Sequence, residues 1–163
     1  MNNQKQLDTL KAYTDYLAAA TAKAKEIAAE HPNKAYNYTE EMQNAFINTI
    51  TDMLCSNPEV FVQTTGPDAD AKLYQYSAPK KNGSGFHFAV MCTDTDKFVA
   101  DAAYKAIPFV DFMEMIVANP DLDGVIVNPY EENKHVMLKE SISYFLQFKP
   151  SNIEFIGFDE FGK

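Results

Sequence analysis

The sequence predicts an α+β fold: a mixed, largely antiparallel sheet packed with helices and preceded by a long N-terminal helix. Apolar residues recur every three or four positions through residues 4–30 and 42–54, which is the period of amphipathic helices. From residue 60 the apolar period falls to about two, which is typical of strands. The first three predicted strands are joined by connections short enough for hairpins, and helices and strands do not alternate strictly. These features favour α+β.

The first predicted helix, over residues 4–30, contains no Gly or Pro and ends at His31 and Pro32. Its apolar stripe is narrow and rich in alanine, which favours a helix but buries little area. The stretch 32–38 separates this stripe from a denser apolar pattern. We therefore expect a helical extension over residues 1–36 and an α+β domain over residues 37–163.

The elements expected in residues 37–163 follow from the period of the apolar residues and from the positions of turn residues. A second helix, capped by Asn37 or Thr39, ends at residues 56–58. The three strands that follow it cover residues 60–65, 71–77 and 86–91. The last of these is apolar almost throughout, which indicates a central position in the sheet.

The remaining elements are shorter and more mixed. Asp94 or Thr93 is expected to cap a short helix that ends at residue 103. The other predicted elements are a helix from residue 108 to 119, strands at 124–127 and around Val136, and a helix over 138–148. Residues 153–158 predict an edge strand or a docked segment.

Composition excludes several kinds of partner. All 14 basic residues are lysine, and the net charge is -9 with a pI near 4.7, which opposes binding to nucleic acid and to anionic membranes. No apolar run is long enough to span a bilayer, and the first thirty residues lack the apolar core of a signal peptide. Cys55 and Cys92 stand among apolar neighbours, which indicates buried, reduced thiols. We therefore expect a cytoplasmic protein.

No motif in the sequence indicates catalysis, a cofactor or a metal. The three histidines, His31, His87 and His135, lie in different segments without a second ligand at metal-binding spacing. Pairs of aspartates near residues 94 and 121 are explained by helix capping and turns. The loop 79–85 precedes a strand rather than a helix, which disfavours a phosphate cradle. We expect no catalytic, cofactor-binding or metal-binding residues.

Tyrosines are the candidate partner-binding residues, because a rigid ring with a polar end suits interfaces. Strands 60–65 and 71–77 are the expected sheet edge, where Tyr74 and Tyr76 would contact an incoming peptide or a second copy of the chain. Half-buried packing is an equally good account of both rings. Asn128 and Pro129 follow a buried strand, as part of a site or as a simple corner.

Residues 86–146 contain three pieces that resemble the SseB family N-terminal domain. They are an apolar strand running into a Thr/Asp turn (88–98), a hydrophobic helix (107–117) and a strand-to-loop element (123–129) before a final helix. The resemblance implies a compact α+β domain, bacterial, with no assigned enzyme activity. The long first helix departs from the family pattern.

The leading functional expectation is a non-catalytic protein-interaction module. Its expected partner is another protein or a second copy of the chain. It predicts an exposed apolar or aromatic patch without a deep polar pocket. The alternative is a small-molecule sensor, or an enzyme with a site assembled from loops. It predicts a concave site with convergent ionisable groups.

Overall fold

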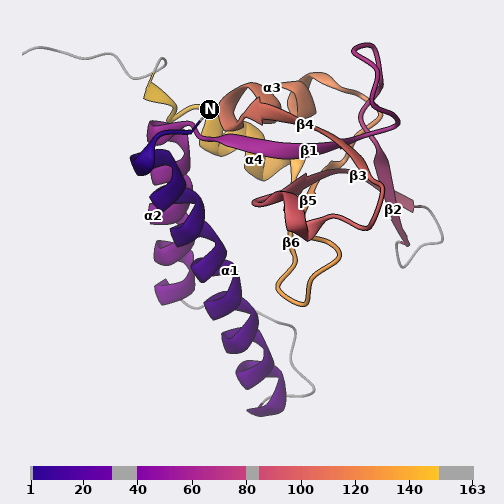
Figure 1. Cartoon of the computed structure of the whole chain (residues 1–163). Helices are drawn as coiled ribbons and strands as arrows, with labels where there is room; N and C mark the ends of the chain where they lie inside the picture. Colours follow the sequence, from indigo (N-terminus) through magenta and orange to yellow (C-terminus); the bar gives the residue numbers. More distant parts are fainter. Residues whose placement is uncertain (1, 31–39, 80–84, 151–163) are drawn as a thin grey trace, which may run out of the picture.

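The computed structural model describes residues 2–30, 40–79 and 85–150. Its sheet has six strands, in the order β4-β1-β3-β5-β6, with β2 paired to β3 beside this path. The helices are α1 (Gln4–Glu30), α2 (Glu40–Ser56), α3 (Phe109–Ala118) and α4 (Lys139–Leu146), and the strands are β1 (Glu59–Thr64), β2 (Gln75–Pro79), β3 (Gly85–Cys92), β4 (Ala103–Pro108), β5 (Gly124–Val127) and β6 (His135–Leu138). The α+β prediction and the long first helix are confirmed (Figure 1).

The sheet is largely antiparallel with one parallel pair. β3 pairs with β1 and β2 antiparallel, and with β5 parallel through Phe88↔Gly124 to Met91↔Val127. β3 is therefore central, as its continuous apolar sequence predicts. The parallel pair requires a long connection, and this connection contains β4 and α3.

Two sequence-based expectations for this sheet are wrong. Residues 96–103 do not form a helix: Asp94 caps only a 3-10 turn (Thr95–Lys97), and the chain then enters β4. β4, which the sequence did not predict, overlaps the expected helix at Ala103 alone and pairs with all six residues of β1. β1 consequently lies between β4 and β3 and is not an edge strand, whereas β2 pairs only with β3 along residues 75–79 in the described chain.

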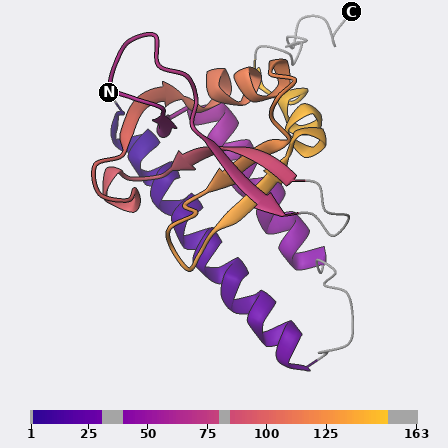
Figure 2. The same ribbon diagram turned by 90° about the vertical axis from the view of Figure 1, so that its right-hand side faces the viewer.

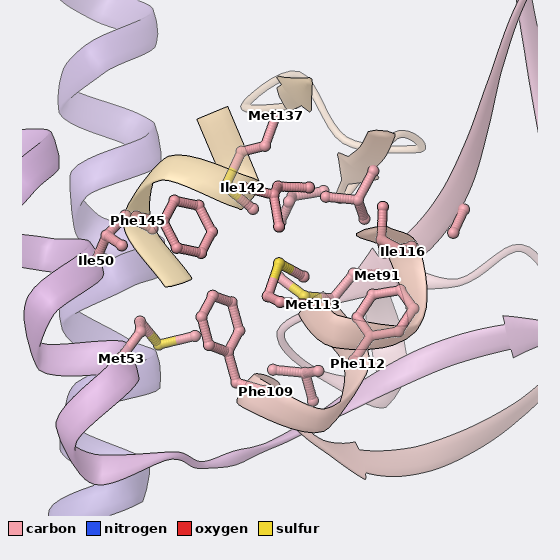
Figure 3. Packing of buried hydrophobic residues seen from close by; sticks show 14 of the residues in the cluster. Ile50, Met53, Met91, Phe109, Phe112, Met113, Ile116, Met137, Ile142 and Phe145 are labelled. Atoms are coloured by element: carbon pink, nitrogen blue, oxygen red, sulfur yellow. The ribbon is translucent and has the colours of Figure 1, made fainter. Parts of the chain in front are cut away.

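The main hydrophobic core lies between one face of the sheet and all four helices. Figure 3 shows side chains of α3 and α4 meeting those of α2 and the sheet, with Phe109 and Phe145 stacked at a centroid distance of 6.2 Å. The opposite face of the sheet carries a smaller cluster built on Phe88, Val90, Cys92 and Ile126. The alternation of side chains along β3 divides these two clusters.

The first helix contributes to the main core. α1 packs alongside α2 (Figures 1 and 2) and buries Leu10, Tyr13 and Leu17, of which Tyr13 is completely buried. The alanine-rich second half of α1 contains none of its buried residues. The boundary expected after residue 36 lies outside the described residues and stays a prediction.

Candidate functional site

An apolar groove of about 920 Å³ lies between α2, β6 and α4. Its apolar lining consists of Phe46, Ile47, Ile50, Leu54, Val136, Met137, Tyr144, Phe145 and Phe148, and its polar lining of Gln43, Thr51, Cys55, His135, Glu140 and Ser141. Several of the apolar side chains are open to solvent, with Tyr144 65%, Ile47 57% and Phe148 50% exposed. Exposed apolar surface concentrated in this way is common at interaction sites.

The groove exists because two helices carry more apolar side chains than the core covers. In α2, Ile50, Met53 and Leu54 enter the core and Phe46 packs partly buried against it, whereas Ile47 extends the apolar stripe into solvent. In α4, Ile142 and Phe145 are buried. Tyr144 and the following Phe148 stand beside them in the groove, with ring centroids 5.4 Å apart.

His135 forms part of the groove wall as a neutral aromatic ring. Its Nδ1 is 3.4 Å from the hydroxyl of Tyr13, and its ring lies edge-on to Tyr16 and Phe46. Burial lowers the pKa of His135 to about 4, because imidazolium loses its hydration there. Burial also raises the pKa of Tyr13, so this contact joins two uncharged groups at neutral pH.

The two cysteines lie in different environments. Cys92 is buried in β3, as expected, and this burial raises its pKa to about 12. Cys55 is exposed and lines the groove, so the expectation that it is buried is wrong. Its neighbours Met53 and Leu54 are buried in the core, whereas Cys55 itself lies on the exposed, groove-lining side of α2.

Tyr74 and Tyr76 do not line the groove: Tyr76 lies in β2, and Tyr74 lies just before it. Tyr74 is 38% exposed, and Tyr76 packs partly buried against the smaller cluster on the helix-free face of the sheet. Tyr130 is their neighbour: it donates a 2.8 Å hydrogen bond to Gln63 Oε1, and its pKa is raised by burial and by the two nearby tyrosines. The structure therefore groups these rings, and their role in partner binding stays a prediction.

Asn128 and Pro129 form a buried corner. Asn128 is 3% exposed and has a φ of 50°, a left-handed conformation that asparagine tolerates. Its Oδ1 accepts a hydrogen bond from Thr93 N at 3.1 Å, and its Nδ2 donates to Thr93 Oγ1 at 3.2 Å. These bonds join the ends of β3 and β5. Direct contact of this corner with a partner stays a prediction.

The groove residues were missed because sequence reasoning assigned a single buried face to each helix. The available signal was the width of the apolar stripe, since Phe46 with Ile47, and Tyr144 with Phe145 and Phe148, occupy more of the helix circumference than one packing face needs. A stripe of this width indicates either a deeper core or an uncovered surface. Only the positions of the neighbouring elements decide between these two.

The fold and the groove together define an α+β protein with an open apolar groove on its surface. Comparisons with known protein families, with curated proteins and with solved structures find no match to this chain. Among the helices of the described residues, none combines the length and the apolar character that a membrane span requires. The same residues bring together no group of three or more His, Cys, Asp or Glu side chains that could hold a metal ion.

Proposed function

We propose that this protein is a non-catalytic protein-interaction module that binds an apolar segment of a partner in the groove between α2, β6 and α4. The observation that carries the proposal is the exposure of large side chains in one concave surface, above all Ile47, Tyr144 and Phe148. A partner that covers such side chains is stabilised in the complex by about 25 cal/mol per Å² of apolar area buried.

The chemistry of the groove supports binding over catalysis. Its ionisable lining residues are Cys55, His135, Glu140 and Tyr144, and they come from three different elements. The lowered pKa of His135 makes it a poor base at neutral pH. The net charge of -9 favours a partner whose apolar segment is flanked by basic residues, with association slowed by salt.

The finer parts of the proposal rest on sequence. The three pieces at residues 88–98, 107–117 and 123–129 support membership of the SseB family, and with it a bacterial source. The free thiols of Cys55 and Cys92 support a reducing compartment and therefore a cytoplasmic location. In this proposal the partner is either another protein or a second copy of the chain.

Site-specific crosslinking tests the proposed function. A photoreactive benzoylphenylalanine in place of Thr51, which lines the groove, should give a discrete adduct with a partner in extracts of the source cell. Ile47→Asp should reduce the adduct at least ten-fold, because a charge in the groove opposes apolar contact. The matched control is Met115→Asp on α3, since Met115 is 40% exposed and does not line the groove. An adduct that survives Ile47→Asp would contradict the proposal.

A small-molecule sensor is the second candidate, because a volume of about 920 Å³ lies within the range of ligand pockets. The apolar lining restricts such a ligand to a hydrophobic molecule with few polar groups. Binding of N-phenyl-1-naphthylamine, followed by its fluorescence and by its loss in Ile47→Asp, tests whether the groove holds small apolar molecules. Among the described residues, no comparable observation favours an enzyme site assembled from loops.

A further inference from the structure

The groove lies beside an open strand edge. β6 is the last strand in the sheet order and pairs with β5 alone among the described strands. Three of its residues, His135, Val136 and Met137, also line the groove. An edge strand presents unpaired backbone N–H and C=O groups, which another extended segment can satisfy. The groove therefore suits a segment that is both extended and apolar.

The chain itself continues from the rim of this groove. α4 follows β6 directly, and Phe148, just beyond α4, lines the groove and is half exposed. The connection over residues 139–152 contains a helix and exceeds a dozen residues, which is what a crossover to a parallel neighbouring strand requires. A strand that begins near residue 153 would therefore start within reach of β6.

The sequence of residues 151–163, which lie outside the described part, has the required chemistry. Its large apolar residues are Ile153, Phe155, Ile156, Phe158 and Phe161. Residues 153–158 place apolar side chains on both faces of an extended chain and include no proline. A strand apolar on both faces suits a position between a sheet edge and the apolar side of a helix.

We propose that residues 153–158 add to the open edge of β6 as a parallel strand and fill the groove with their apolar side chains. The proposal rests on the proposed function, because it makes this segment an internal competitor for the site where a partner binds. A covalently attached segment acts at an effective concentration on the order of millimolar, so it lowers the apparent affinity of any partner segment.

Cys55 provides the test, because it lines the groove whereas Cys92 is completely buried. In the full chain, Cys55 should react with dithiobis(nitrobenzoate) at least ten-fold more slowly than in the double variant Phe155→Asp/Phe158→Asp. The matched control is Asp159→Asn/Glu160→Gln, which should react as the wild type does. Cys92 remains unreactive in any folded variant, so its reactivity reports loss of the fold. Equal Cys55 rates in the wild type and in a folded apolar-to-Asp variant would overturn the proposal.

Hydrogen exchange on the wild type tests the same proposal without a variant. If β6 is paired on both sides, the amides of residues 135–138 should all exchange slowly, whereas an open edge leaves every second amide fast. Fast exchange at alternate positions overturns the proposal. Protection that disappears on dilution also overturns it, because it would show that a second copy supplies the strand.

The two proposals fail in different ways. The internal strand is supported if position 51 crosslinks to residues 151–163 of the same chain. The proposed function is contradicted if, in addition, the Phe155→Asp/Phe158→Asp variant gives no adduct with a partner. If instead a partner adduct forms and Cys55 reacts at the same rate in the wild type and in Phe155→Asp/Phe158→Asp, the groove binds a partner and the proposed internal strand is wrong.

Discussion

Replacing Gly124 by alanine should destabilise the protein strongly, because β5 and β6 approach each other too closely at this position for a side chain. A Cβ on Gly124 would overlap the carbonyl oxygen of Met137 and would lie only 3.0 Å from Leu138 Cα. Both neighbours are backbone atoms of β6 and cannot rotate away. Relief requires β6 to move relative to β5, at the expense of the ladder between Gly124↔Leu138 and Val127↔His135.

The expected magnitude follows from two opposing terms. Overpacking a tight interior costs about 1–3 kcal/mol, and contacts with backbone place Gly124→Ala at the upper end of that range. The lower chain entropy of alanine returns less than about 1 kcal/mol. A net loss of about 2–3 kcal/mol in the free energy of unfolding should lower Tm by roughly 5–10 °C for a chain of this size.

Urea unfolding followed by circular dichroism measures this loss, with Gly66→Ala as the matched control. A Cβ on Gly66 meets no atom within 4 Å, so Gly66→Ala should stay within about 0.5 kcal/mol of the wild type. If Gly124→Ala unfolds at the wild-type urea concentration, β5 and β6 do not approach each other as closely as the register Gly124↔Leu138 requires.

Two further predictions concern the contact between α1 and β6. Tyr13→Ala should cost about 3–5 kcal/mol of unfolding free energy because Tyr13 is completely buried, whereas Tyr13→Phe should cost less than about 1 kcal/mol because the hydroxyl lies 3.4 Å from His135 Nδ1. A wild-type urea midpoint for Tyr13→Ala would show that α1 is not part of the core. The folded pKa of His135, about 4, lies below its ordinary value of 6.5, so the unfolded chain binds the proton first and stability is lost as pH falls from about 6.5 towards 4. Urea titrations at pH 7.5 and pH 5 should show a loss on the order of 2 kcal/mol that His135→Phe reduces. An identical pH dependence in His135→Phe would assign the loss to other groups.

The sequence alone determined the helices and most of the strands, because these depend on local periods and on stop residues. The period through residues 4–30 predicts α1, and the Asn-Pro pairs at 119–120 and 128–129 stand just beyond the ends of α3 and β5. The continuous apolar run of β3 also indicated its central place, because only a strand covered on both faces tolerates such a sequence. Each of these inferences uses residues within one element.

Only the tertiary structure decided which elements meet. β4 is absent from the elements that the sequence predicts, and it becomes a strand because β1 offers it a complete ladder. Tyr13 and His135 are far apart in the sequence and meet because α1 packs near the end of the sheet. The groove likewise depends on where α2, β6 and α4 leave Ile47 and Tyr144 uncovered. Local periodicity shows that one face of an element is apolar. Which element packs on that face is set by long-range packing, whose free energy is shared among elements distant in the chain.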